Sequence, residues 1–397
     1  MTTTTHDELP LVTLDQPTIM TFGDLRLDLQ KQAGVCQIRT PAGHEAWLVT
    51  RHAEVKALLS DTRLGRSHPD PANAPKFLNN PMLDMLITDA PPDVERHEHM
   101  KKQRLYTGSF AARRVLDQRA RVEAIAERMI DDILAGEQPA DLHGGFSMPF
   151  SQAALCDMMG IPSGDRVELL SMMDRVGNVK DEGDSYVGMD TLFGFAMRIA
   201  TQVRAEPGDN VVSRFVEAGL PDQEIATHIV ALLFTGLSGL ASHIDYGITL
   251  FLRNPDQLAL ATADPDVMAK AVEEVLRATI GSPVLPRYAH EDIEIDGRTI
   301  RQGELVMIDF SLANYDPRVF EEPFAFRVTR SPNPHFTFSY GMRHCTGAPL
   351  VRIVLHVAYS TLFRRIPTLK LAVPYESLHR HPGGRLAGGL AELPVSW

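Results

Sequence analysis

One long apolar segment bounded by prolines constrains the fold of this chain more than any other feature. Leu220-Pro221-Asp222 is a helix start signal, and no stop signal follows until Arg253-Asn254-Pro255. A helix of thirty-odd residues rises by about 1.5 Å per residue and therefore crosses an entire domain. Because residues 229–240 are apolar on all sides, the sequence predicts that this helix runs through the core.

The chain carries no signal for a membrane or for export. Its most apolar part, residues 229–241, is too short and too interrupted by Thr, Ser and Gly to cross a bilayer. Residues 1–7 contain neither the basic region nor the apolar run of a signal peptide. Only Cys36, Cys156 and Cys345 occur, and three cysteines build no disulfide framework. We therefore expect a cytoplasmic protein in a reducing compartment.

The net charge of −12, from 39 basic and 51 acidic side chains, disfavours nucleic acid and anionic membranes as partners. The ordinary apolar content, 44%, predicts a folded chain rather than a disordered one.

The remaining patterns predict a mainly α protein with a minor β part. Short alternating strands are expected at 35–39 and 46–49, followed by a helix over 53–60, and helical periodicity dominates residues 93–277. Strands and turns follow after residue 277, and a last helix begins after Cys345. No linker divides the chain, so we expect one domain over 1–397, with a flexible segment over about 1–20. The long loop 61–92 is rich in Pro and Asn but also in apolar side chains, which favours a pocket wall.

The strongest chemical signal is the segment Phe338-Ser-Tyr-Gly341-Met-Arg343-His-Cys345-Thr-Gly347-Ala348. Its glycines let backbone N–H groups approach the sulfur, and the helix that follows favours the thiolate over the thiol. A thiolate held in this way predicts a metal ligand. The spacing Phe-x-x-Gly-x-x-x-Cys-x-Gly resembles the haem-binding loop of the cytochrome P-450 family, in which the cysteine is the axial iron ligand.

Other segments resemble the same family in the same order. Taken alone, Glu274 and Arg277 form an i,i+3 surface pair, but Glu274-Val-Leu-Arg277 matches the family's Glu-x-x-Arg signature. The resemblance implies that this pair is buried and joined by Arg330. It covers about residues 35–397 and implies the fold of the soluble bacterial members, a triangular, α-rich single domain with haem between the long helix and the Cys345 loop.

The resemblance also implies residues for the haem. Cys345 would bind the iron, Arg287 and Arg343 would bind the propionates, and Phe338 and Gly347 belong to the cysteine loop. Counting back from Phe110 places His99 on the family's propionate-binding histidine. The arginine expected four residues later falls on Gln103, with His97, Lys101 and Arg104 as possible substitutes.

The long helix departs from the family pattern. Ala-Gly-x-Glu/Asp-Thr falls on Thr235-Gly236-Leu237-Ser238-Gly239, so Ser238 replaces the acid and Gly239 replaces the alcohol. That pair ordinarily relays protons to iron-bound dioxygen. Two interpretations stay open: ordered water or a substrate hydroxyl takes over the role, or the chemistry differs from hydroxylation, for example by radical coupling.

The function implied by the resemblance is a haem-thiolate monooxygenase acting on a bulky, largely apolar small molecule of natural-product biosynthesis. It implies haem b, electrons from NAD(P)H through a reductase and a ferredoxin, and a monomer. The alternatives are oxidative C–C or C–N coupling without oxygen insertion, peroxide-driven oxidation, and a haem protein that senses ligands without turnover. The expected pocket walls are Phe77, Met82, Met85, Leu86, Leu232, Leu237, Leu240, Val284, Leu285 and Leu386.

Overall fold

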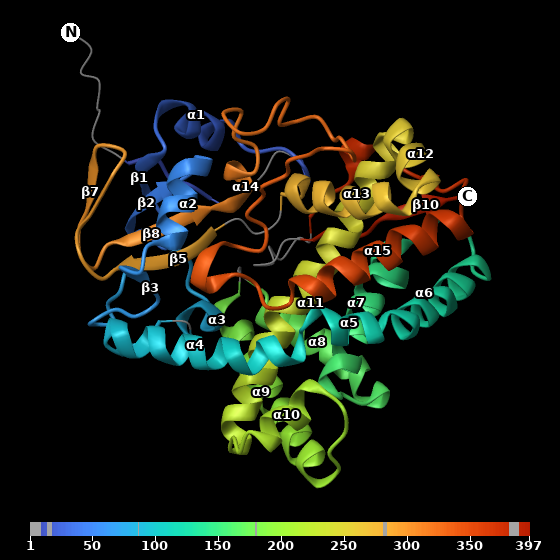
Figure 1. Ribbon diagram of the computed structural model, residues 1–397, viewed down its shortest axis with the longest axis horizontal. Coiled ribbons are helices and arrows are strands. Elements are labelled where there is room, and N and C mark those ends of the chain that lie inside the picture. Colours follow the sequence, from blue (N-terminus) through green and yellow to red (C-terminus); the bar gives the residue numbers. More distant parts are fainter. Residues whose placement is uncertain (1–8, 14–17, 86, 179–180, 281–283, 381–388) are drawn as a thin grey trace.

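The computed structural model describes residues 9–13, 18–85, 87–178, 181–280, 284–380 and 389–397 (Figure 1). Helices make up most of this part of the chain, which confirms the predicted mainly α class. They are α1 (Asp24–Gln32), α2 (His52–Ser60), α3 (Pro81–Asp84), α4 (Pro92–Ser109), α5 (Ala112–Asp117), α6 (Arg119–Leu134), α7 (Met148–Met159), α8 (Arg166–Val176), α9 (Glu182–Ala205), α10 (Val211–Glu217), α11 (Asp222–Arg253), α12 (Pro255–Ala263), α13 (Pro265–Ala278), α14 (Phe310–Ala313) and α15 (Ala348–Arg365). Short helical turns of other types are η1 (His143–Ser147), η2 (Ser163–Asp165), η3 (Gly341–Arg343) and η4 (Tyr375–Ser377).

The β part consists of small sheets, of which the largest lies at the left of Figure 1 and the one that contains β10 lies near the C-terminus at the right. The strands are β1 (Val35–Arg39), β2 (Glu45–Val49), β3 (Leu64–Gly65), β4 (Ala140–Asp141), β5 (Val284–Ala289), β6 (Ile293–Ile295), β7 (Arg298–Ile300), β8 (Leu305–Asp309), β9 (Lys370–Leu371) and β10 (Pro394–Ser396). The largest sheet has the order β1-β2-β8-β5-β3, in which β2 and β8 are parallel and the other neighbours antiparallel. Because this sheet joins strands from both ends of the chain, residues 35–65 and 284–309 fold as one unit.

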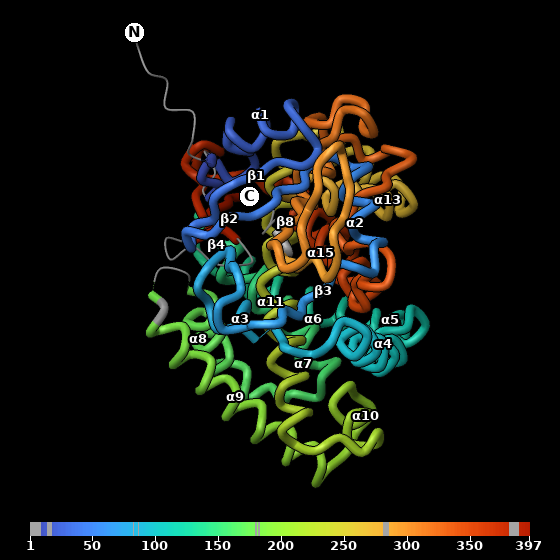
Figure 2. The backbone as a smooth tube through the Cα atoms, turned by 90° about the vertical axis from the view of Figure 1, so that its left-hand side faces the viewer, coloured from blue at the N-terminus to red at the C-terminus, as the bar shows by residue number. Residues whose placement is uncertain are grey.

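The predicted long helix is α11, which crosses the middle of the molecule (Figures 1 and 2). It begins directly after Pro221 and ends before Pro255, as the two prolines predict. α11 is long and apolar enough to cross a membrane, but 56% of its most apolar window is buried inside the protein. It is therefore the core helix that its all-round apolar composition predicts.

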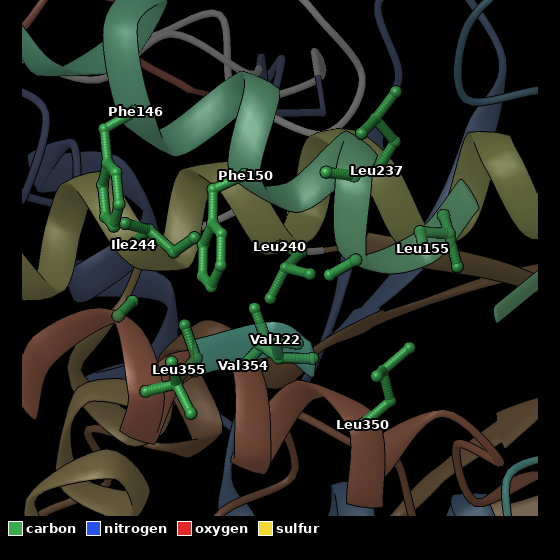
Figure 3. Packing of buried hydrophobic residues seen from close by; sticks show 14 of the residues in the cluster. Val122, Phe146, Phe150, Leu155, Leu237, Leu240, Ile244, Leu350, Val354 and Leu355 are labelled. Atoms are coloured by element: carbon green, nitrogen blue, oxygen red, sulfur yellow. The ribbon is translucent and has the colours of Figure 1, made fainter. Parts of the chain in front are cut away.

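One face of α11 packs tightly against α7 and α15. Figure 3 shows Leu237 and Leu240 of α11 beside Leu155 of α7 and above Leu350 and Val354 of α15. Leu237 and Leu240 keep only 1% and 4% of their surface. In this structure their side chains belong to the buried cluster between the helices, and their predicted place in a substrate pocket stays a prediction.

The loop that precedes α4 packs against the largest sheet. Phe77 is buried in a cluster with Leu48 of β2 and Met307 of β8. The ring thus completes the core under the sheet, and its predicted place in a pocket wall stays a prediction.

The expected flexible segment over 1–20 lies partly outside the described residues. In the part that is described, Leu11 pairs with Arg39, and Val12 and Ile19 are buried. These residues therefore belong to the packed fold.

Candidate active site

A closed loop places Cys345 just before α15. The Cys345 backbone N–H donates to the Phe338 carbonyl at 2.8 Å, and η3 lies between the two residues. Gly341 adopts a positive φ of 68°, and a Cβ atom there would lie 3.1 Å from the Leu59 carbonyl oxygen. Glycine is thus required for both conformation and space. Phe338 is buried, with the Arg352 guanidinium 4.6 Å from its ring centre.

Cys345 differs from the other two cysteines in its surroundings. Cys156 is buried and Cys36 is half-buried, whereas Cys345 has accessible surface. Burial raises the pKa of all three thiols, that of Cys156 to about 12. Since Cys345 is also closely surrounded by protein, we conclude that it lines an opening rather than the outer surface.

The neighbours of Cys345 lower the pKa of its thiol, but the net pKa is still above the ordinary value. Backbone N–H groups of Gly347 and Ala348 and the charge of Arg352 lower its pKa, yet burial outweighs them. The expectation that the helix N-terminus makes a thiolate is therefore not met by the protein alone. A bound metal ion inverts this balance, because it deprotonates a coordinating thiol outright.

Behind this loop, Glu274 and Arg277 of α13 form a fully buried ion pair. The two Glu274 oxygens accept from Arg277 at 2.8 Å each, and Arg330 donates to the same carboxylate at 3.0 Å. Arg277 also donates to the carbonyls of Asn314, Pro323 and Ala325. The structure thus brings together the three residues named for the scaffold, with one carboxylate shared by two guanidinium groups that also donate to backbone carbonyls.

A cluster of buried cations lies on the sheet side of the Cys345 loop. Arg287 of β5 is 3% exposed, and its only hydrogen bond among the described residues is to the Pro286 carbonyl. Burial and the nearby charges of Arg66 and Arg343 hold the pKa of Arg287 well below its ordinary value. Burial and Arg343 likewise lower the pKa of Arg66 to about 10. We call Arg66, Arg287 and Arg343 the arginine cluster.

Glu95 of α4 is the carboxylate that interacts with the arginine cluster. It accepts from Arg343 at 2.5 Å and from the Arg66 backbone N–H at 3.0 Å. Gly65 permits this approach, because a Cβ atom there would lie 2.2 Å from a Glu95 oxygen. One carboxylate does not balance three guanidinium groups, and Arg66 Nε and Arg343 Nη1 are buried without a hydrogen-bond partner in the described part of the chain.

The cluster therefore fits a ligand that brings further carboxylates. Arg287 and Arg343 also line a small cavity of about 20 Å³, which has room for a water molecule only and is lined as well by Leu64, Ile308 and Met342. A haem, with two propionates, would raise the number of carboxylates to three, equal to the number of guanidinium groups. The residues present thus fit the cofactor that the cysteine loop implies.

The predicted contacts on α4 are met in part. His99 Nε2 lies 3.4 Å from the Met342 carbonyl oxygen, and burial together with Arg343 and Arg66 lowers the pKa of His99 to about 4. Gln103 donates to the His344 carbonyl at 3.1 Å, so it ties α4 to the cysteine loop.

The possible substitutes for Gln103 do not join the arginine cluster, whereas a residue from another part of the chain does. His97, Lys101 and Arg104 are exposed and take no part in the arginine cluster. Arg66 takes part in it, and the sequence analysis missed both Arg66 and its partner Glu95. The sequence gives little indication of this contact, because only the glycine before Arg66 is consistent with a close approach of another side chain to the backbone.

The middle of α11 is open on the side opposite its packed leucines. Thr235 is exposed, and Gly236, Ser238 and Gly239 keep part of their surface, although residues before and after them are buried. The Thr235 hydroxyl donates to the Ala231 carbonyl at 2.7 Å. An ideal Cβ atom on Gly239 would meet no atom of the described residues within 4 Å. Ser238 and Gly239, at the family's acid and alcohol positions, thus border open space and supply no carboxylate.

Most of the remaining predicted pocket residues cannot be assigned to a wall. Leu232 is half-buried on the open side of α11, and Met85 is 45% exposed. Leu86 and Leu386, and the side chains of Met82, Val284 and Leu285, lie outside the described residues.

A larger cavity, of about 750 Å³, lies elsewhere, between α6 and α7. Its lining includes Arg121, Arg128, Asp157 and Arg166 and shares no residue with the cysteine loop or the arginine cluster. We therefore do not place the active site there.

Comparison with known proteins identifies the family to which the chain belongs. The family model for cytochrome P450 matches residues 210–368. Pentalenolactone synthase of Streptomyces exfoliatus is 37% identical over 98% of this chain and 100% of its own length. The chain belongs to the cytochrome P450 family.

Solved P450 structures share the whole fold. Substrate-free PimD, a polyene macrolide antibiotic pimaricin epoxidase, is 44% identical with a TM-score of 0.89, covering 99% of this chain and 100% of its own. SgvP, a putative thioether synthase in the tailoring of griseoviridin, is 29% identical with a TM-score of 0.91, covering 98% and 100%. The predicted P450 fold is thereby confirmed. This P450 is an oxidoreductase of the monooxygenase family, and the family implies a haem whose iron is bound by a thiolate.

Proposed function

We propose that this P450 binds haem b through Cys345 and oxidises a bulky, largely apolar natural product in the cytoplasm as a single-domain monomer. The observation that carries the proposal is the exposed Cys345 beside an arginine cluster that has one carboxylate for three guanidinium groups. When bound, the haem supplies dioxygen activation, for which the thiolate provides electron density.

The protein's own residues would hold and orient the cofactor. Cys345 would bind the iron, and the arginine cluster would bind the propionates with charge-assisted hydrogen bonds. Phe338, with Arg352 over its ring, would hold the cysteine loop in place through its carbonyl, which accepts from the Cys345 N–H. His99 is kept neutral by burial and by Arg343, so it would offer a hydrogen bond rather than a charge.

Haem retention tests the arginine cluster. In Arg66→Gln, one propionate loses a partner, and haem transfer to excess apomyoglobin should become at least about 10-fold faster, since a charge-assisted hydrogen bond is worth about 1.5–3 kcal/mol. Arg63→Gln is the matched control, because Arg63 is an exposed neighbour that pairs with Asp61. Equal rates for Arg66→Gln and the parent would contradict this role.

The substrate class is inferred from relatives. The names of these relatives denote the synthesis or tailoring of pentalenolactone, pimaricin and griseoviridin, which are natural products. Leu232 on the open side of α11 offers an apolar contact. We infer a substrate of the same broad class.

A coupling oxidase is the second candidate, favoured by Ser238 and Gly239. If water simply replaces the missing acid and alcohol, Ser238→Glu/Gly239→Thr should raise product per reducing equivalent without changing the product. We expect the opposite, because the open space at Gly239 would receive a threonine side chain and an added carboxylate costs desolvation. If the double variant forms more of the same product per reducing equivalent, the parent is an ordinary hydroxylase and not a coupling oxidase.

Electrons would come from NAD(P)H through a reductase and a ferredoxin, which would dock on α4. Lys101, Lys102 and Arg104 are exposed there, next to Gln103, whose amide contacts the cysteine loop. This local positive charge suits an acidic partner despite the net charge of −12. Lys101→Glu/Lys102→Glu should slow ferredoxin-dependent reduction at low salt and leave dithionite reduction unchanged, and equal ferredoxin rates would exclude this face.

A further inference from the structure

A histidine on α11 lies beside the position from which the acid–alcohol pair is missing. His243 follows Gly239 by one helical turn, and its Nδ1 lies 2.6 Å from the Gly239 carbonyl oxygen. Because a carbonyl oxygen only accepts hydrogen bonds, Nδ1 must carry the proton. In the neutral ring, Nε2 therefore holds a lone pair and no proton.

The free nitrogen of His243 faces the open side of the helix. Leu232, Thr235, Gly239 and His243 follow one another at spacings of three and four residues, so they share one face of α11. Each keeps accessible surface within a helix that is otherwise largely buried. Within the described part of the chain, Nε2 of His243 has no hydrogen-bond partner, and it is not itself a buried atom. Nε2 is thus accessible, on a residue one helical turn from Gly239 along the shared face of α11.

The surroundings of His243 keep the ring fixed and neutral. The Tyr359 hydroxyl of α15 donates to the His243 carbonyl at 2.6 Å. Burial lowers the pKa of His243, the bond to Gly239 acts in the opposite direction, and the charge of His335 lowers the pKa further. His335, in the loop before Cys345, is held by Glu273 of α13 at 3.1 Å. The ring is thus a base at neutral pH.

No other titratable side chain of α11 is as well placed. Between Ile225 and Ile244 the helix carries one further such residue, His228. Its Nδ1 is bound to the Tyr106 hydroxyl at 2.6 Å. It also lies eleven residues before Gly239, or about 16 Å along the axis.

We propose that His243 is the proton-transfer residue of this active site, in place of the missing acid and alcohol. When a protic ligand enters the space beside Gly239, the Nε2 lone pair takes its proton and the ligand is left as an anion. The imidazolium then returns the proton to a neighbouring oxygen or to solvent water, so the ring ends neutral. This proposal rests on the proposed function, since the space is taken to be that above the haem.

Hydrogen cyanide is a suitable probe, because it binds ferric haem as the anion and must lose a proton first. Cyanide association is followed on haem-loaded protein across a range of pH. His243→Asn keeps an amide donor for the Gly239 carbonyl but has no basic nitrogen. We expect its association rate at neutral pH to be about 10- to 100-fold below that of the parent. His228→Asn, the matched control on the same helix, should keep the parent rate.

An association rate and pH profile of His243→Asn equal to those of the parent would overturn the proposal. His243→Gln provides the same comparison with a longer amide if His243→Asn does not load haem. The ferrous–carbon monoxide spectrum of each protein separates this proposal from the proposed function. A parent without the red-shifted band of thiolate ligation would refute the haem-thiolate assignment, whereas a normal band with unchanged cyanide rates would refute only the role of His243.

Discussion

Two neighbouring glutamates differ in burial and in the number of their hydrogen-bond partners. Glu274 is fully buried and accepts from Arg277, Arg330, Asn333 and the Arg327 backbone, whereas Glu273 is half-buried beside Arg352. The burial of the first pair was predicted from the resemblance to the P-450 family, because the i,i+3 spacing alone indicates a surface pair.

Removing the buried carboxylate should be far more damaging than removing its neighbour. Glu274→Ala leaves two arginines unpaired in the interior, and we expect it to lower the free energy of unfolding by about 3–5 kcal/mol. Glu273→Ala should lower it by much less, because that side chain keeps contact with solvent. Chemical unfolding, with the haem-to-protein ratio of each purified variant, measures both. A fully loaded Glu274→Ala protein of parental stability would show that the pair is superficial.

Residues that come together from distant segments escaped prediction. Arg66 follows a two-residue strand and Glu95 lies at the start of α4, and no local pattern links them. Their contact depends on how residues 61–92 cross the sheet. The cysteine loop, by contrast, is one continuous segment and was found directly.

At the level of elements, boundaries were more predictable than contact faces. Prolines bound α11, so its length could be predicted to within about two residues. Its leucines could not be assigned to a side, because a helix that is apolar all round gives no periodic signal. This is why Leu237 and Leu240 were placed in a pocket although they pack against α7 and α15 (Figure 3).

Two glycines of α11 offer a test of this packing. A Cβ atom on Gly247 would lie 2.1 Å from the Tyr359 hydroxyl, whereas one on Gly239 would meet nothing in the described residues within 4 Å. Gly247→Ala should therefore destabilise the protein by about 1–3 kcal/mol through overpacking. Gly239→Ala should be neutral or stabilise by up to about 1 kcal/mol, since alanine favours the helix.

Thermal unfolding of the haem-loaded variants makes the comparison. If both alanines shift the melting temperature equally, α11 and α15 do not pack as described.

At the level of the whole molecule, three separate parts of the chain supply the residues of the candidate site. The cysteine comes from the segment before α15, the arginine cluster from the sheet and the cysteine loop, and the open face from the middle of α11. The resemblance to the P450 family predicted this arrangement, and composition alone would have predicted only a mainly α protein.

The central claim is that Cys345 binds the iron of a haem. Cys156 is buried and Cys36 is half-buried, whereas Cys345 is exposed. Neither Cys36 nor Cys156 has a glycine-flanked helix start, so we expect neither to take its place. The most direct measurement is the ferrous–carbon monoxide difference spectrum of the parent and of Cys345→Ala. We predict the red-shifted Soret band of thiolate ligation in the parent and its complete loss in Cys345→Ala. A Cys345→Ala protein that retains this band would contradict the account.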